Sequence, residues 1–297
     1  VKVPILSGGF NHVLGERTSV GLSVYSIGSG SDYSHAAIPG MGFPDVKTKI
    51  AYVIFAPTLS YKVTPDLAVG VSTLLGVQQL QARGLVAPMP NGSLGLSSTH
   101  GIQTQTGIGW RVGGLWTINP LLSVGASYSP KMRFADADGY QDDLLAVAGG
   151  HLDLPEQYGM GLALHVTDGL TLAADYLRIN WGDVGFLNDP NGAGLNSQDV
   201  YRVGASWNAS NTVTLRAGFK TASEAVDARH TAANYYSPGI LNDSISAGFT
   251  YHLPEQTDVS LGYEYHLPET LHGKGSSAGS NIDAHYSQVL LGIGIKF

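Results

Sequence analysis

The sequence feature that most constrains the fold is an alternation of apolar residues with small or polar ones, with a period of two. In the last ten residues, QVLLGIGIKF, the odd positions hold Val289, Leu291, Ile293, Ile295 and Phe297, whereas glycine and polar residues take most of the even positions. Successive side chains of a β-strand point to opposite faces of a sheet, so this segment is predicted to be a strand with one apolar face. Such a face points into the core of a soluble sandwich, but it points outward into lipid in a membrane barrel.

The same alternation recurs along the whole chain and predicts an all-β protein. One face of each segment is apolar, and the other carries glycine, hydroxyl groups or charge. Nothing in the sequence supplies a second layer that would bury all the apolar faces, which favours a barrel whose apolar faces contact lipid. Aromatic residues near the strand ends suit the membrane interface, and they are Tyr128, Tyr176, Tyr201, Trp207, Tyr251 and Tyr265. The predicted strands are thirteen: 3–12, 18–28, 48–63, 67–82, 103–118, 121–134, 153–167, 170–182, 199–208, 212–222, 243–253, 257–267 and 283–297.

The connections between these strands alternate between short and long. Short links with turn residues occur at 63–66, 118–120, 166–169 and 209–211. Long polar stretches occur at 29–47, 82–103, 136–151, 183–198, 223–242 and 268–281. This is the plan of an antiparallel outer-membrane barrel with long extracellular loops. Because such barrels generally have an even number of strands, we expect a fourteen-stranded parent with about thirteen strands represented here, in a single domain over 1–297.

Composition narrows the class further. Charged residues make up 13% of the chain, against about 25% in a typical soluble domain. No apolar run approaches the roughly 18 residues of a membrane-spanning helix, which excludes a helical membrane protein. The net charge is −7 without a basic run, so nucleic acid is not expected as a partner. The absence of cysteine fits an oxidising compartment.

Several stretches resemble the FadL family, outer-membrane transporters of long-chain fatty acids and aromatic hydrocarbons. They are FAPTLSYKVTPDLAVGVST (55–73), SYSPKMRF (127–134), DLPEQYGMGLALHVTDGLTLAADYLRINW (153–181), YYSPGILNDSISAGFTYHLPEQTDVSLGYEY (235–265) and the terminal aromatic residue. The resemblance implies a monomeric barrel of fourteen strands in the outer membrane of a Gram-negative bacterium, in contact with outer-membrane lipid. It also implies an N-terminal hatch with an Asn-Pro-Ala motif. Neither stands at the start of this sequence, so the hatch and the first strand are expected to be missing.

The resemblance further implies a kink in the strand at 18–33, where the family opens its wall for sideways release of substrate. The sequence supports this independently, because the apolar phase of Val20, Leu22 and Val24 slips before two glycines, as at a β-bulge. A plain strand end is the alternative. The expected kink residues are Ser26, Ile27, Gly28 and Gly30.

The resemblance places the family's outer binding groove between two loops, both of which here contain apolar residues. We therefore expect capture of a hydrophobic molecule by these loops, passage into the lumen and passive lateral release. Sideways release avoids moving apolar surface through water, at roughly 0.8 kcal/mol for each CH₂. The alternative is that these residues only pack the loops together. They are Leu85, Val86, Met89, Leu94 and Leu96 in the first loop, and Leu144, Leu145 and Val147 in the second.

The main alternative function is a general or anion-selective porin, in which inward-facing basic residues line a water-filled pore. These residues are Arg111, Lys131, Arg133, Arg202, Arg216 and Lys220. Acids at 136–143 lack the spacing of an EF-hand calcium loop, so no metal or cofactor is expected. Asp227 and His230, with Asp142 and Asp143, are weak evidence for a protease. The chain is not expected to be an enzyme.

Overall fold

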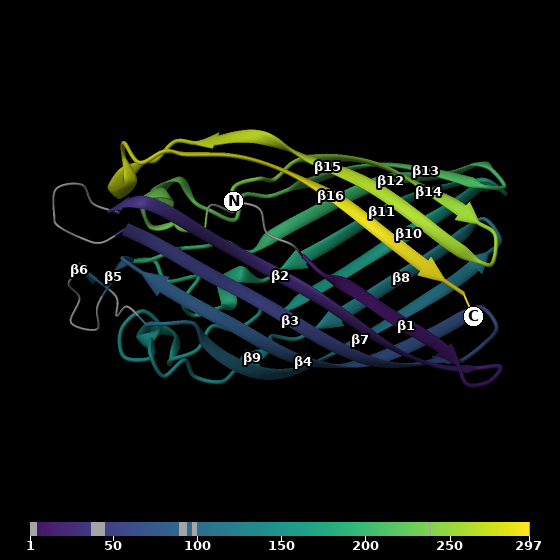
Figure 1. The fold of residues 1–297 in the computed structure, drawn as a ribbon, viewed down its shortest axis with the longest axis horizontal. Coiled ribbons are helices and arrows are strands. Elements are labelled where there is room, and N and C mark those ends of the chain that lie inside the picture. The colour runs from purple at the N-terminus through teal and green to yellow at the C-terminus, as the bar shows by residue number, and fades with distance from the viewer. Residues whose placement is uncertain (1–4, 37–44, 89–93, 97–99, 238, 297) are drawn as a thin grey trace.

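The chain forms one large antiparallel sheet curved into a barrel (Figure 1). The computed structural model describes residues 5–36, 45–88, 94–96, 100–237 and 239–296. Thirteen strands follow one another as hydrogen-bonded neighbours in chain order, and β9 (Arg133–Phe134) pairs with β7 as the fourteenth. The thirteen are β1 (Ser7–Val13), β2 (Thr18–Ala36), β3 (Asp45–Lys62), β4 (Leu67–Arg83), β7 (Gln103–Asn119), β8 (Leu122–Ser129), β10 (Gln157–Thr167), β11 (Leu170–Ile179), β12 (Gln198–Ser210), β13 (Val213–Ala222), β14 (Ser244–Leu253), β15 (Thr257–Leu271) and β16 (Ile282–Ile295).

The remaining elements belong to the loops at one end of the barrel. A small separate hairpin consists of β5 (Val86–Pro88) and β6 (Leu94–Leu96). Among the described residues, four short 3₁₀ helices lie at the loop end, opposite the short turns (Figure 1). They are η1 (Ala146–Ala148), η2 (Trp181–Asp183), η3 (Ala228–Ala233) and η4 (Gly275–Ser277). No helix within the described ranges has the length and apolar character needed to cross a membrane.

The predicted strands and the alternation of short and long connections are confirmed. The largest difference in a boundary is that β2 continues to Ala36 and β3 begins at Asp45, where the sequence suggested a loop over 29–47. In addition, β15 continues to Leu271, into the loop expected at 268–281. The extension of β2 and β3 is stabilised by an ion pair of 2.9 Å between Lys47 and Asp32, which face each other in the β2–β3 ladder. Because this segment is rich in glycine and serine, it lacks the alternating apolar residues that predict a strand.

The apolar faces of the strands point outward, as the alternation predicted. Side chains that would be buried in a soluble sandwich are exposed on the wall, for example Ile108 at 68%, Met160 at 62% and Ile293 at 77%. Aromatic pairs also lie on the outer face, with ring centroids 5.7 Å apart for Trp110 and Tyr128. A lipid environment is the solvent in which such a surface is stable.

The strands β1 and β16 form the two edges of the sheet. All neighbouring strands are antiparallel, so the first and last of thirteen run in the same direction, and both end at the short-turn end in Figure 1. Because β1 and β16 run in the same direction, a single strand antiparallel to both could pair with each of them in the regular way.

A one-residue bulge changes which residues of the strand at 122–134 face the lumen. Val112 of β7 faces Tyr128, whereas Ile108 faces Arg133, so five steps on one strand match four on the other. The extra residue lies at Ser129–Met132, next to Pro130, which has no N–H to donate to the ladder. Beyond the bulge Met132 and Phe134 point inward and are buried, and Arg133 points outward.

Candidate functional site

Along β3 and β4, the inward face is apolar near the loops and polar near the short turns. Near the loops, an inward-facing cluster, the wall cluster, covers β3 and β4. Near the short turns, hydroxyl groups and charges on the inward face bond to one another, as in the Thr58–Ser72 pair at 2.7 Å and the Arg216–Thr250 pair at 2.6 Å. The wall cluster consists of Tyr52, Ile54, Ala56, Leu74, Met132 and Phe134.

Glycines make room for the wall cluster. A Cβ atom on Gly76 would lie 2.6 Å from Met132 and 2.8 Å from Phe134, and one on Gly107 would lie 2.9 Å from the Phe134 ring. The large side chains that follow the bulge therefore lie flat against bare backbone of β4 and β7. This packing leaves the centre of the lumen free beside β2 and β3.

A cavity of about 250 Å³ occupies that position. Its wall side is formed by Ile27, Gly28 and Ser29 of β2 together with Ile50 and Tyr52 of β3. The opposite side comes from the segments that connect β9 to β10, β11 to β12 and β13 to β14, and from the first residue of β12. These contribute Leu152, Asp153, Leu154, Trp181, Leu187, Leu195, Gln198, Ala225, Val226, Ser237 and Gly239. Most of the lining is apolar, as in sites for small hydrophobic ligands.

The connection from β13 to β14, residues 223–243, reaches across the lumen to the opposite wall and is here named the crossing loop. The Tyr33 hydroxyl of β2 donates to the carbonyl oxygen of Tyr235 at 2.6 Å, and the Thr48 hydroxyl of β3 donates to that of Tyr236 at 3.2 Å. The hydroxyls of Ser29 and Ser237 are 2.9 Å apart. These contacts fix the crossing loop over the cavity, and burial raises the pKa of the Tyr236 phenol.

The loops above the cavity form a second apolar cluster, the loop cluster, which contains part of the predicted capture groove. Leu85, Leu144 and Leu145 are buried in it beside Tyr140, whereas Val147 is half-exposed. The structure therefore brings the two predicted loops together, with these three leucines packed inside. Val86, Leu94 and Leu96 contribute backbone to the β5–β6 hairpin, where Val86 faces Leu96, and Met89 lies outside the described residues.

The predicted bulge at Ser26–Gly30 is absent from the β2–β3 pairing. The register between the two strands runs without a shift from Thr18 to Asp32. The phase change in the sequence has another cause, because Ile27 faces inward opposite Tyr52 and lines the cavity. On the other side of β2, the pairing with β1 ends at Tyr25, so residues from Ser26 onward have no strand partner there among the described residues.

The predicted lumen-lining basic residues divide into two groups. Arg111 lies inside the barrel, 6.0 Å from the centre of the Tyr25 ring, and Arg202 and Lys220 face each other on β12 and β13. Arg216 also faces inward and bonds Thr250. Arg133 was wrongly placed in the lumen, since the bulge turns it outward, and Lys131 donates to the backbone oxygen of Asp183 at 3.2 Å.

A hydroxyl, an imidazole and a carboxylate also lie in sequence on the inward face near the short turns. The Thr214 hydroxyl is 2.8 Å from His252 Nε2, and His252 Nδ1 is 2.7 Å from Asp258. This order recurs in hydrolases, but here Thr214 is only 4% exposed and its hydroxyl donates to Asn208 at 2.9 Å. A nucleophile must reach its substrate, so the arrangement is a structural hydrogen-bond network.

The residues suggested for a protease or a metal site have other partners. Arg229 forms a two-pronged ion pair with Asp227, and His230 bonds the backbone oxygen of Pro190 at 3.0 Å. Within the described ranges, no group of three or more His, Asp or Glu side chains is placed to hold a metal ion.

Sequence reasoning missed the wall cluster and the inner lining of the cavity. One signal was present, because Ile50, Tyr52 and Ile54 are apolar on the inward phase of a strand whose outward phase is apolar too. A strand that is apolar on both faces contacts lipid on one side and buried apolar groups on the other. The docking of the crossing loop left no such signal.

The outward apolar face, the long loops at one end and the apolar chamber inside the wall define a membrane-spanning β-barrel of the transport class. The chain belongs to the family of outer membrane protein transport proteins (OMPP1/FadL/TodX), whose family model matches residues 3–295. It is therefore an outer-membrane protein of Gram-negative bacteria, from a family of transport proteins and not of enzymes. The predicted family, fold class and location are confirmed.

Solved structures share the fold. The toluene transporter TodX of P. putida is 19% identical and matches with a TM-score of 0.69, over 97% of this chain and 80% of that one. The toluene transporter TbuX of Ralstonia pickettii is 18% identical, with a TM-score of 0.67 and the same coverage. A FadL homologue of Pseudomonas aeruginosa is 16% identical, with a TM-score of 0.64, over 97% and 76% of the two chains. No curated protein matches the sequence.

Proposed function

We propose that this protein carries small hydrophobic molecules, of the size of monoaromatic hydrocarbons, through the outer membrane without an energy source. The observation that carries the proposal is the apolar cavity of about 250 Å³ that borders the inward face of β2. Relatives of the same fold are described as toluene transporters, which fits this chemistry.

The cavity volume bears on the choice between an aromatic hydrocarbon and a long-chain fatty acid. An apolar protein cavity of about 150 Å³ is large enough to bind benzene. A fatty acid with three times as many carbons would need about 450 Å³ on that scale. The cavity therefore suits one aromatic ring with small substituents, and it is too small to enclose a long acyl chain.

The polar inward groups near the short turns support lateral release past β2. A molecule that continued along the axis would meet the polar half near the short turns. Leaving an apolar site for water costs roughly 0.8 kcal/mol per carbon, or about 6 kcal/mol for the seven carbons of toluene. The route past Ile27 leads from the cavity toward lipid, across the side of β2 that lacks a described strand partner beyond Tyr25.

Entry from outside requires the loops to move. The loop cluster and the crossing loop lie over the cavity, and the three bonds between the crossing loop and β2–β3 hold it closed. We propose that a hydrophobic molecule is first captured on exposed apolar loop residues such as Val147. It then reaches the cavity when the crossing loop releases.

We further propose that the chain acts as a single barrel domain and a monomer. One strand antiparallel to both β1 and β16 would complete the wall, which would leave no open sheet edge for a second copy. The second candidate function is that of a porin, because inward-facing charges such as Arg202 and Lys220 could line a water-filled pore. A wide, stable ohmic conductance in a planar bilayer would favour the porin, whereas toluene uptake with little ion current favours the transporter.

The lateral route can be tested by narrowing it at Ile27. Glycines 28 and 30 are poor sites for this, because a Cβ atom would lie 3.2 Å from the Ile50 oxygen and 2.7 Å from the Thr48 oxygen. Ile27→Trp places bulk in the cavity instead. Its matched control is Val24→Trp, which adds the same ring on the outer face of the same strand.

We expect Ile27→Trp to lower the uptake of labelled toluene at least fivefold, while assembly, read from the heat-modifiable band on gels, stays normal. Val24→Trp is expected to transport normally. Equal uptake by the two variants would mean that the path does not pass Ile27.

A further inference from the structure

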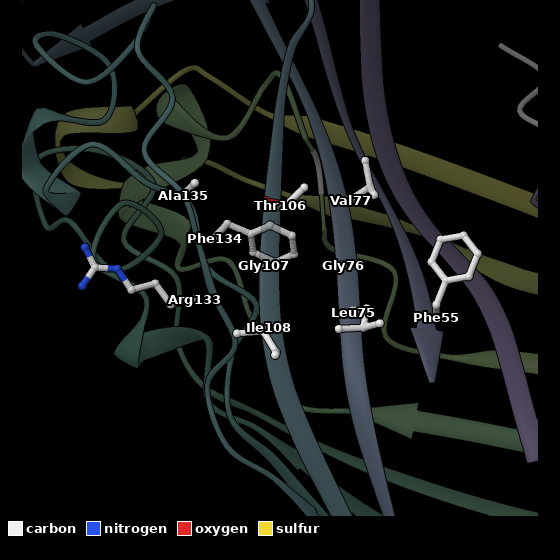
Figure 2. A pocket seen from close by; sticks show the side chains of 10 residues that line it. All are labelled: Phe55, Leu75, Gly76, Val77, Thr106, Gly107, Ile108, Arg133, Phe134 and Ala135. Carbon is white, nitrogen blue, oxygen red and sulfur yellow. The ribbon is translucent and has the colours of Figure 1, made fainter. Parts of the chain in front are cut away.

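A hollow of about 640 Å³ lies on the membrane-facing wall, separate from the cavity (Figure 2). The side chains around it are Phe55 of β3, Leu75 and Val77 of β4, and Ile108 of β7, all on the outward face. We propose that this hollow binds an acyl chain of a phosphorylated lipid of the outer leaflet, and that separate phosphate groups of this lipid contact Lys49 and Arg133 on the two flanks of the hollow.

The floor of the hollow separates it from the transport route. Gly76 and Gly107 face each other in the β4–β7 ladder, and their backbone forms the floor. Phe134 closes the wall from inside, where its ring packs against both glycines. A molecule in the hollow is therefore in contact with the bilayer and not with the lumen.

The hollow lies just below the level at which the outer wall becomes polar. Going toward the loops, the outward positions of β4 change from Leu75 and Val77 to Gln79, and those of β3 change from Val53 to Lys49. Two residues of a strand span about 7 Å, so the apolar part and the polar part are one side-chain step apart on β4 and two steps apart on β3. An acyl chain in the hollow would place its headgroup beside Gln79 and Lys49.

The charges at this level favour an anionic headgroup. Lys47 and Arg83 are paired with Asp32 and Asp45 at 2.9 and 2.8 Å. Lys49, in contrast, donates to the neutral Oε1 of Gln79 at 2.8 Å, a contact that leaves its charge uncompensated.

Arg133 supplies the second charge on the flank of the hollow. Its side chain is 71% exposed, and its contact with Asp136 is long, at 3.9 Å. Figure 2 shows its guanidinium extended beyond β9, away from the floor of the hollow. A guanidinium binds phosphate oxygens in pairs, which suits it to a phosphate ester at the edge of the hollow.

Selectivity would come from the headgroup and the shape of the hollow. Acyl chains are already in hydrocarbon, so their burial against the wall gains no hydrophobic free energy, only packing. A cation near a membrane surface attracts anionic lipid by about 1 kcal/mol. Two cations beside one packed chain are therefore expected to retain a phosphorylated lipid that a bare apolar wall would exchange freely.

The test uses the protein in detergent micelles with lipid A as the probe and dephosphorylated lipid A as the control lipid, with bound lipid counted by native mass spectrometry. The charge variant is Lys49→Gln with Arg133→Gln, and its control is Arg178→Gln, which removes a cation elsewhere on the wall. The shape variant is Val77→Trp, and its control is the equally outward Val203→Trp.

We expect the charge and shape variants to retain lipid A at least fivefold more weakly than the unmodified protein, whereas the control variants should retain it normally. Every form should retain the dephosphorylated lipid only weakly. The proposal is overturned if both controls lose as much as their partners, or if the two lipids are retained equally. If Val77→Trp fails to give the heat-modifiable band, Thr106→Trp, at the rim of the same hollow, takes its place. Toluene uptake is expected to stay normal in the charge variant, which separates this proposal from the proposed transport function.

Discussion

The sharpest test of the transport route is a covalent lock on the crossing loop. The hydroxyls of Ser29 in β2 and Ser237 in the crossing loop are 2.9 Å apart, so cysteines at both positions are close enough to form a disulfide. The chain contains no cysteine, so no other thiol competes. Because the bond joins the loop to the wall beside the cavity, it is expected to hold the crossing loop closed.

The expected size of the effect follows from the contacts that now hold the loop. Three hydrogen bonds, made by Ser29, Tyr33 and Thr48, contribute about 1 kcal/mol each, or about 3 kcal/mol together. At 1.4 kcal/mol per factor of ten, the loop is then open in roughly one molecule in a hundred. Oxidation of the double cysteine variant removes that open population and should lower toluene uptake to the background of cells without the protein.

The same numbers predict the opposite change for a weakened loop. Tyr33→Phe removes one bond of about 1 kcal/mol, so the open fraction and the uptake at low toluene concentration should rise about fivefold. Both effects are measured as initial rates with labelled toluene in cells that express the variant. Assembly is checked by the heat-modifiable band.

The matched control for the lock is a disulfide between Ser19→Cys and Ser60→Cys, whose hydroxyls are 3.0 Å apart on β2 and β3. It crosslinks the wall without touching the crossing loop, so its uptake should be unchanged, and reductant should restore uptake only in the Ser29–Ser237 pair. Undiminished uptake by the fully oxidised Ser29–Ser237 pair would refute the gating role of this loop.

Three other outcomes are expected. Gly107→Ala should lower the free energy of unfolding by about 1–3 kcal/mol, because the added Cβ would lie 2.6 Å from the backbone oxygen of Arg133. The control Gly292→Ala, whose Cβ would lie 3.6 Å from its nearest neighbour, should be nearly neutral, and both effects are read from urea midpoints. Ala225→Phe should fill the cavity and reduce toluene uptake, whereas Ala205→Phe on the outer face should leave uptake unchanged. Equal uptake by the two variants would show that the cavity is not on the transport route. The Arg229 guanidinium lowers the pKa of Asp227 to about 2, so its stabilisation of the crossing loop is complete above about pH 4 and is lost as the pH falls through 2. Pepsin should therefore begin to cleave within 223–243 only at the low end of that range, and in Asp227→Asn cleavage should no longer depend on pH there.

The barrel could be predicted from local sequence patterns. The apolar phase and the turn residues are local properties, readable within one strand or one hairpin, and they gave the thirteen main strands and the face of each one that contacts lipid. The even-number rule and the resemblance pointed to the family. The prediction failed for β2 beyond residue 28, because this stretch is rich in glycine and serine and has too few apolar residues to show an alternation.

The contents of the lumen, in contrast, depend on contacts that form only in the folded barrel. One extra residue beside Pro130 exchanges the inward and outward faces, which sends Phe134 into the lumen and Arg133 out of it, and no periodicity count fixes the position of such a bulge in advance. The cavity depends on contacts between residues far apart in the chain, such as Ser29 and Ser237. Those contacts arise where loops of irregular conformation meet across the barrel, and local sequence carries no record of which loop reaches which wall.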